Sequence, residues 1–310
     1  RTLSWSLKNI IRCQPHKKTE VYTFMKKLLL LLLLLTEHNS FSCDAIWKAG
    51  AENDSGPTQL LKDIFEITNI KNNGSLENAV RQTQFKWLRP QFMERWHHYR
   101  LLDNRQRRDL ETLIKDSALT KEKTPTQKHY DAVILCCGWS FFVQKRIDFL
   151  VKLYKQGLTF DKFYLLGCDR SLKSSPDEEK KLIPLLKQKN IALEEVALVE
   201  YLWQQTDMPE ALKTFPIKLY KVSKRQDGLR STLCDALMLM VRNEKITKGE
   251  SFLLITNNPY ICMHDAVAKK ILAPYEINIE TVGAAMEKET LENVLDSIAR
   301  CLYNLKNKAE

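Results

Sequence analysis

The chain has 310 residues, of which 44% are hydrophobic and 28% are charged, with only 9 Gly and 10 Pro. These values exclude a fibrous or low-complexity chain and allow one or two globular domains with a sizeable core. The formal net charge is +10, and residues 1–42 supply half of it, with seven basic and two acidic side chains. The rest of the chain is only moderately basic, so we expect no nucleic-acid partner.

The first 42 residues are predicted to lie outside the folded domain. Met25-Lys26-Lys27 is followed by eight leucines and then by a polar stretch that ends in Ser40-Phe41-Ser42. A positive end, an apolar run and small residues at positions −3 and −1 are typical of a secretory signal peptide. Eight leucines extend about 12 Å as a helix, too short for a hydrocarbon core of roughly 30 Å. The alternative is a buried Leu-rich helix. We assign 1–24 as an upstream or unstructured segment and 25–42 as a signal peptide, which predicts an exported, periplasmic or envelope-associated protein.

Cysteine usage bears on the same prediction. Cys43 directly follows the predicted cleavage point, so lipidation of this residue, with membrane attachment, is an alternative to simple cleavage. Six further cysteines follow without a C-x-x-C pair or a zinc-ligand spacing, and no metal site is predicted. Six free thiols are unusual in an exported protein, so they either weigh against export or imply a disulfide that the sequence does not assign.

Residues 43–128 are predicted to form a helical lead-in and a linker. Asn73-Gly74 interrupts a helical pattern of apolar residues, and Ser75 caps a second run that contains Trp87. Pro90 is expected to kink or split this run. A polar linker ends the region.

From position 129 the pattern changes to short apolar strands that alternate with amphipathic helices. Tyr130–Cys136 shows no polar alternation, which is typical of a strand buried on both faces. Strands that alternate with helices form parallel sheets with right-handed crossovers. We therefore predict a doubly wound, mainly parallel Rossmann-like α/β domain over 129–310 that ends in a C-terminal helix. The predicted strands are 130–136, 163–167, 195–199, 217–222, 252–256 and 277–282, and the predicted helices are 141–155, 176–189, 229–243, 260–272 and 291–305.

The loops after the strands hold the candidate site, because doubly wound sheets bind ligands beyond the carboxyl ends of their strands. Arg146 and Arg225 are expected to meet an anionic ligand. Glu178 and Glu179 are the acid/base candidates if a reaction occurs, although carboxylates at a helix start also stabilise its dipole. The other candidate ligand-binding residues are Gly138, Trp139, Gly167, Asp169, Thr232, Asp235, Asn257, Asn258 and Tyr260.

Motifs of several common enzyme classes are absent from the sequence. The first predicted strand is followed by Cys137-Gly138-Trp139-Ser140-Phe141 rather than G-x-G-x-x-G, and there is no P-loop, no G-x-S-x-G and no H-E-x-x-H. These absences disfavour NAD-dependent, ATP-dependent and serine-hydrolase activities and leave open whether the protein is an enzyme. His264 lacks a metal-ligand spacing and is expected at the solvated surface.

The order of motifs between positions 130 and 282 resembles the YdcF/SanA/ElyC-like family of bacterial envelope-associated proteins. The family's D-A-V-I-V-L-G-G strand is similar to Asp131–Gly138, and its helical Arg to Arg146. Its N-T-x-x-N-A motif resembles Ser231–Ala236, and its V-T-S-x-Y motif resembles Ile255–Tyr260. The resemblance implies a Rossmann-like sheet with a polar cleft and a role in cell-wall or envelope-polysaccharide metabolism. For some relatives it also implies S-adenosylmethionine as the ligand.

Two hypotheses of function follow. In the first, an envelope-associated α/β protein binds an anionic or nucleotide-like small molecule in the strand-end cleft. In the second, a non-catalytic interaction protein docks a partner through aromatic and Arg side chains of the helical region 58–119. A solvated basic face is the alternative explanation of that region.

Overall fold

The structure is a computed structural model, and it describes residues 43–48, 56–89, 101–172, 182–223, 231–287 and 289–306. The predicted upstream segment and signal peptide lie outside these residues. Residues Ser42–Glu310 form one compact unit. Within the described ranges, no helix has both the length and the apolar character that a membrane crossing requires.

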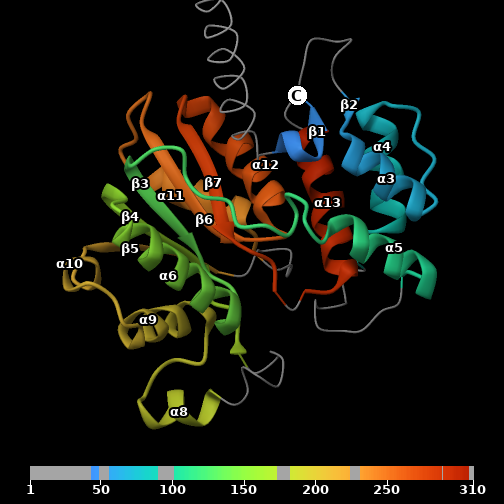
Figure 1. The fold of residues 1–310 in the computed structure, drawn as a ribbon. Helices are drawn as coiled ribbons and strands as arrows, with labels where there is room; N and C mark the ends of the chain where they lie inside the picture. Colours follow the sequence, from blue (N-terminus) through green and yellow to red (C-terminus); the bar gives the residue numbers. More distant parts are fainter. Residues whose placement is uncertain are drawn as a thin grey trace, which may run out of the picture. The chain divides into compact units, whose positions relative to one another are not determined.

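The centre of this unit is a five-stranded parallel sheet with the strand order β5-β4-β3-β6-β7 (Figure 1). The chain lays down β3, adds β4 and β5 on one side, and then returns to add β6 and β7 on the other. This topology confirms the predicted doubly wound, Rossmann-like α/β fold. The strands are β3 (His129–Cys136), β4 (Thr159–Cys168), β5 (Ile217–Val222), β6 (Ser251–Asn257) and β7 (Asn278–Ala284).

Helices cover both faces of the sheet. Val133 and Leu165 belong to the cluster under α6 and α9, whereas Ile134 and Leu166 belong to the cluster under α11 and α12. Successive strand residues are therefore buried on opposite faces, which explains the continuous apolar sequences of the strands. The helices of this region are α6 (Ser140–Lys155), α8 (Ile183–Gln188), α9 (Glu195–Gln205), α10 (Glu210–Lys213), α11 (Leu233–Asn243), α12 (Ile261–Leu272), η3 (Ala273–Tyr275) and α13 (Leu291–Lys306).

The helical lead-in shares a hydrophobic core with the C-terminal helix. Leu61 and Leu110 of the lead-in lie in one cluster with Val294 and Ile298 of α13, and Figure 1 shows these helices side by side. Trp87 is 1% exposed and is a core residue of the same cluster. The lead-in consists of η1 (Cys43–Ala45), β1 (Trp47–Lys48), β2 (Gly56–Pro57), α3 (Gln59–Ile67), α4 (Leu76–Lys86) and α5 (Asn104–Ile114).

One predicted strand is wrong, because residues 195–199 begin helix α9. Val196, Val199 and Trp203 are buried three and four positions apart, so they lie on one helical face against α6 and β4. A short apolar run fits a strand and a buried helix equally well, and the helical period becomes clear only when Trp203 is included. Part of the predicted helix 176–189 falls outside the described residues, and α8 corresponds to its end.

Candidate functional site

The chain changes direction along the sheet between β3 and β6, so the carboxyl ends of these strands form the topological switch point. Arg146 of α6 occupies this point and is 3% exposed. Its Nη1 donates to the carbonyl oxygens of Cys136, at 2.8 Å, and Cys137, at 2.9 Å. Its Nε donates to Asn257 Oδ1 at 3.0 Å. Arg146 therefore connects the ends of β3 and β6 through main-chain and amide oxygens.

Gly138 and Trp139 complete the loop after β3. A Cβ on Gly138 would lie 3.2 Å from Arg146 Nη1, so the glycine leaves room for the guanidinium group. Trp139 stacks on Phe142 with ring centroids 5.7 Å apart. The guanidinium carbon of Arg170 lies 5.9 Å from the Trp139 ring, which joins this loop to the loop after β4 through a cation–π contact.

Arg170 follows β4 and is a buried cation with unused donors. Its side chain is 10% exposed, and its Nη2 pairs with Glu195 Oε1 at 3.3 Å. The other oxygen of Glu195 accepts from Cys168 Sγ at 2.7 Å. The Nε and Nη1 atoms of Arg170 are buried and have no hydrogen-bond partner among the described residues. Each buried unpaired donor costs about 1–3 kcal/mol, and an anion at these nitrogens would remove that cost.

Cys137 and Gly167 pack tightly at the ends of β3 and β4. A Cβ on Gly167 would lie 2.3 Å from Cys137 Sγ and 2.7 Å from Val196 Cγ2, so the glycine is required for this close approach. Burial, and then the charge of Glu195, raises the pKa of the Cys137 thiol well above its ordinary value. Burial raises the pKa of Cys136 to about 11. Both groups are neutral thiols at pH 7 and are therefore not activated nucleophiles.

The side chains of Asn258 and Tyr260, which follow β6, form hydrogen bonds with other segments of the chain. Asn258 Nδ2 donates to the carbonyl oxygens of Ala118, at 3.1 Å, and of Lys121, and thereby fixes the linker against the end of β6. Tyr260 is 1% exposed, and its hydroxyl donates to Glu289 Oε1 at 2.7 Å. Both side chains contact the protein itself at this edge.

His264 is buried, contrary to the expectation that it lies at the solvated surface. It is 8% exposed, and its Nδ1 lies 2.8 Å from Thr256 Oγ1. Its ring stacks on that of Tyr260 with centroids 6.0 Å apart. The hydroxyl partner and the ring contact compensate for burial of the imidazole, which the sequence pattern alone did not reveal.

Three other predicted site residues, Thr232, Asp235 and Asp169, form hydrogen bonds within the protein. The backbone N–H and the hydroxyl of Thr232 donate to Asp235 Oδ2 at 2.7 and 2.8 Å, so this pair caps the start of α11. The backbone N–H of Asp169 donates to the carbonyl oxygen of Val222 at 3.2 Å and extends the β4–β5 ladder. Glu178, Glu179 and Arg225 fall outside the described residues.

Arg170 and Glu195 are not among the residues that were assigned to the site from the sequence. Arg170 had a detectable signal, because it is a basic residue directly after a predicted strand. Glu195 had none, because it lies 25 positions away at the start of a helix that was predicted as a strand. Only the three-dimensional packing of α9 against β4 brings the two together.

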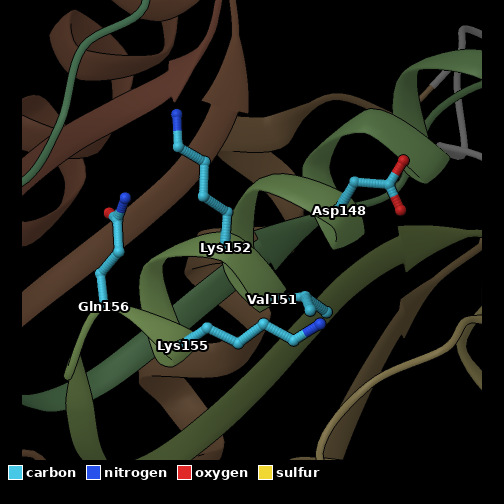
Figure 2. Close-up of a pocket in the computed structure, with 5 residues that line it drawn as sticks. All are labelled: Asp148, Val151, Lys152, Lys155 and Gln156. Carbon is cyan, nitrogen blue, oxygen red and sulfur yellow. The ribbon is translucent and has the colours of Figure 1, made fainter.

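An open hollow lies on the last turns of α6, away from the carboxyl edge. It is lined by Asp148, Val151, Lys152, Lys155 and Gln156 (Figure 2). Lys152 Nζ pairs with Glu122 Oε1 at 2.6 Å, so one of the two lysine charges in the hollow is already neutralised. The hollow includes none of the predicted site residues.

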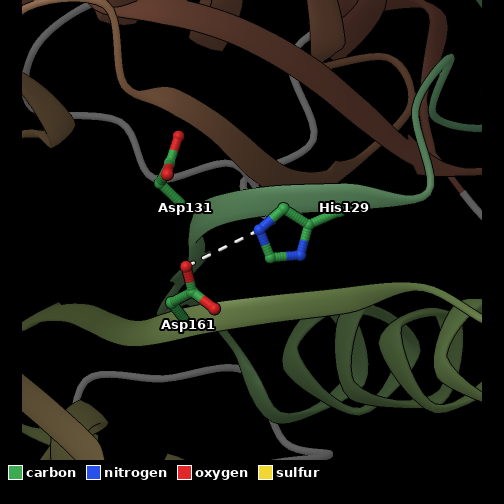
Figure 3. Close-up of side chains that lie close together, drawn as sticks. All are labelled: His129, Asp131 and Asp161. Atoms are coloured by element: carbon green, nitrogen blue, oxygen red, sulfur yellow. Dashed lines mark ion pairs between the residues drawn. The ribbon is translucent and has the colours of Figure 1, made fainter.

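His129, Asp131 and Asp161 form a small cluster at the amino ends of β3 and β4 (Figure 3). His129 Nε2 lies 3.6 Å from Asp161 Oδ2, and both side chains are more than half exposed. Asp131 accepts from the backbone N–H and hydroxyl of Ser251 at 2.6 and 2.8 Å, and these bonds lower the pKa of its carboxyl group. The cluster lies at the edge of the sheet opposite to the predicted cleft. We describe it as a surface ion pair beside a carboxylate that accepts hydrogen bonds from Ser251.

Comparisons of this chain with family models, curated proteins and solved structures found no match.

Proposed function

We propose that this protein binds a small anionic molecule at the carboxyl edge of its sheet and that Arg170 meets the negative charge. The supporting observation is a buried guanidinium group whose Nε and Nη1 lack hydrogen-bond partners among the described residues. Taking a charge out of water is costly unless it is paired and hydrogen-bonded. Glu195 supplies one partner. An oxyanion at the two remaining nitrogens would supply charge-assisted hydrogen bonds, which are the stronger kind.

Arg170 is a better candidate than Arg146 because their guanidinium groups have different contacts. Arg146 already donates to two carbonyl oxygens and to Asn257, so an anion would compete with groups that are in place. Arg170 lies at the end of β4, where doubly wound sheets bind ligands, and Trp139 offers an aromatic face beside it. The role predicted for Arg146 therefore passes to Arg170 in this proposal.

The proposal keeps the ligand classes that the sequence resemblance implies. The ligand is an anionic or nucleotide-like small molecule, with S-adenosylmethionine as one candidate. The protein is exported and takes part in cell-wall or envelope-polysaccharide metabolism. A carboxylate or phosphate group would bind Arg170, and a heterocyclic ring would lie against Trp139. The proposal concerns binding alone, because the acid/base candidates Glu178 and Glu179 lie outside the described residues.

Replacing Arg170→Leu tests the proposal. Wild type and variant are titrated with inorganic phosphate, ATP and S-adenosylmethionine by calorimetry and thermal shift. Native mass spectrometry of protein from a bacterial host identifies any retained ligand. We expect wild type to bind at least one of these anions saturably. We expect the variant to bind it at least tenfold more weakly, because hydrogen bonds to charged groups contribute about 1.5–3 kcal/mol each.

Lys221→Met is the matched control. It removes a cation near the same edge, on β5, that is 41% exposed and paired with Glu194, and the affinity should not change. Equal affinity in wild type and Arg170→Leu, or no binding of any of the three anions by wild type, would contradict the proposal.

A further inference from the structure

The backbone N–H of Cys43 faces a buried carboxylate. Cys43 is 4% exposed. Its amide nitrogen lies 3.4 Å from Asp265 Oδ2, and its Sγ lies 3.2 Å from the same oxygen. Asp265 is on α12, more than two hundred positions away in the sequence. The residue that directly follows the predicted cleavage point is thus held inside the protein by its backbone as well as its side chain.

Asp265 has one oxygen that is not satisfied. The residue is 1% exposed, and Lys269 Nζ pairs with Oδ2 at 2.8 Å. Cys43 also donates to Oδ2. The second oxygen, Oδ1, is buried and has no hydrogen-bond partner among the described residues. A buried carboxylate oxygen without a hydrogen-bond donor is costly, and the described residues supply no donor to Oδ1.

A cleavage between Ser42 and Cys43 would create that donor. Signal peptidases hydrolyse such a bond: water adds across it, Ser42 receives a carboxyl group, and Cys43 receives an amine that is protonated at neutral pH. The resulting ammonium group has three N–H donors where the peptide has one. We expect one donor to remain on Oδ2 and another to turn toward Oδ1 of the same carboxylate. The ammonium group would also bring a positive charge next to the carboxylate group of Asp265.

The boundary of the compact unit supports the same position. The unit begins at Ser42, and the sequence places small residues, Ser40 and Ser42, at −3 and −1 of this bond. The start of the compact unit and the predicted cleavage point therefore lie within one residue of each other.

We propose that the chain is cleaved between Ser42 and Cys43 and that Asp265 binds the α-ammonium group of the new N-terminus. This ion pair locks the start of the mature chain onto α12, so that removal of the signal segment completes the folded structure. The inference rests on the predicted export signal and is independent of the proposed anion site.

The surroundings of Asp265 accommodate an additional cation. Burial lowers the pKa of Lys123. Burial lowers the pKa of Lys269, but Asp265 outweighs this effect, and the net pKa is raised. The thiols of Cys262 and Cys301 have pKa values well above the ordinary value and are neutral. Asp44 contributes a further negative charge next to Cys43.

The first test is the mass of the mature protein. The full chain is expressed in a secreting bacterial host, and the product is examined by intact mass and N-terminal sequencing. We expect a chain that begins at Cys43 with a free amine. A product that retains any residue before Cys43 would overturn the proposal. So would one that carries acyl groups on the nitrogen or sulfur of Cys43, because those atoms would no longer fit against Asp265.

The second test measures the coupling between the new N-terminus and Asp265. Asp265→Asn is compared in the processed chain and in a full chain in which Ser42→Leu blocks cleavage by placing a large residue at −1. We expect the melting temperature to fall further in the processed chain, by roughly 2–4 °C more. Lys248→Met is the control and should change the melting temperature of both chains equally, because Lys248 pairs with Glu276 and not with Asp265. If Asp265→Asn lowers the melting temperature of both chains equally, the proposed ion pair is refuted.

If the Asp265→Asn variant fails to fold, the ion pair can be tested by measuring the stability of the processed and cleavage-blocked wild-type chains as a function of pH. A free α-amino group titrates near pH 8, and a carboxylate partner raises its pKa in the folded state. The stabilisation is therefore fully present below the unfolded pKa and is lost as the pH rises through the folded pKa. The surrounding groups, Asp44, Lys123, Lys269 and the two thiols, are common to both chains. The difference in stability between processed and cleavage-blocked wild type should thus disappear above about pH 10. A difference that does not depend on pH contradicts the proposal.

Discussion

Arg146 Nε and Asn257 Oδ1 lie 3.0 Å apart, and this hydrogen bond joins the helix after β3 to the end of β6 across the switch point of the sheet. The same guanidinium group donates to the last carbonyl oxygens of β3. In a doubly wound sheet this is the position where ligands usually bind. Here a side chain of the protein fills it, which moves the candidate ligand contact to the neighbouring loop after β4.

The contacts of Arg146 predict that it stabilises the fold. Arg146→Met would leave the carbonyl oxygens of Cys136 and Cys137 without these donors. We expect the free energy of unfolding to fall by about 3 kcal/mol, at about 1–3 kcal/mol for each buried group left unpaired. Urea denaturation measures the change. Lys155→Met, on the exposed side of α6, should stay within about 0.5 kcal/mol of wild type. An Arg146→Met variant as stable as wild type would contradict this interpretation.

The sequence predicted the strands and helices around this switch point, but not the contacts that the side chains make there. The strand and helix pattern located β3, β6 and the loops after them, because buried parallel strands and amphipathic helices have distinct periods. It also placed Arg146 inside the crossover helix, one to two turns from its start. Whether a guanidinium group meets a ligand or a carbonyl oxygen depends on separations of about 3 Å between residues far apart in the chain. No sequence spacing encodes the contact of Arg170 with Glu195 for the same reason.

Gly167→Ala should destabilise the protein through steric conflict. The new Cβ would meet Cys137 Sγ at 2.3 Å and Val196 Cγ2 at 2.7 Å, so α9 or the end of β3 must shift. Overpacking of a well-packed core costs about 1–3 kcal/mol, which chemical denaturation can resolve. Gly56→Ala is the control, because no atom lies within 4 Å of the added Cβ. If both substitutions have the same small effect, the close approach at Gly167 is not as tight as described.

Thiol alkylation should distinguish the cysteines by burial. Burial raises the pKa of Cys136 to about 11 and that of Cys137 well above its ordinary value, so little thiolate forms at neutral pH. Cys234 is half-buried on α11 and is more accessible than Cys136. We expect iodoacetamide at pH 7.5 to modify Cys234 before Cys136 or Cys137 in the native protein, as measured by peptide mass spectrometry. All three should react at comparable rates in denaturant. Early modification of Cys136 in the native state would show that the end of β3 opens readily.

Ionisation of Asp296 should make the free energy of unfolding depend on pH at acidic pH. It is 2% exposed on α13, accepts from Arg300 at 2.9 and 3.1 Å, and accepts from the backbone N–H of Arg89 at 3.0 Å. Burial raises the pKa of its carboxyl group, but Arg300 and Arg89 outweigh burial, and the net pKa is lowered. A lowered folded-state pKa contributes stability above the unfolded value of about 3.9, and this contribution is lost as the pH falls through the folded pKa.

Asp296→Asn should therefore cost about 2 kcal/mol at pH 7, the typical contribution of hydrogen bonds to a charged group. The difference from wild type should narrow steadily as the pH falls below about 4, because wild type then protonates the same carboxylate. Urea denaturation at pH 7, 5 and 3.5 measures both effects. Asp109→Asn, in an exposed pair with Arg105, is the control and should change stability by less than about 1 kcal/mol at each pH. A cost of Asp296→Asn that is constant from pH 7 to 3.5 would mean that the charge of Asp296 does not contribute to stability, either through the ion pair with Arg300 within α13 or through the hydrogen bond from Arg89 of the lead-in.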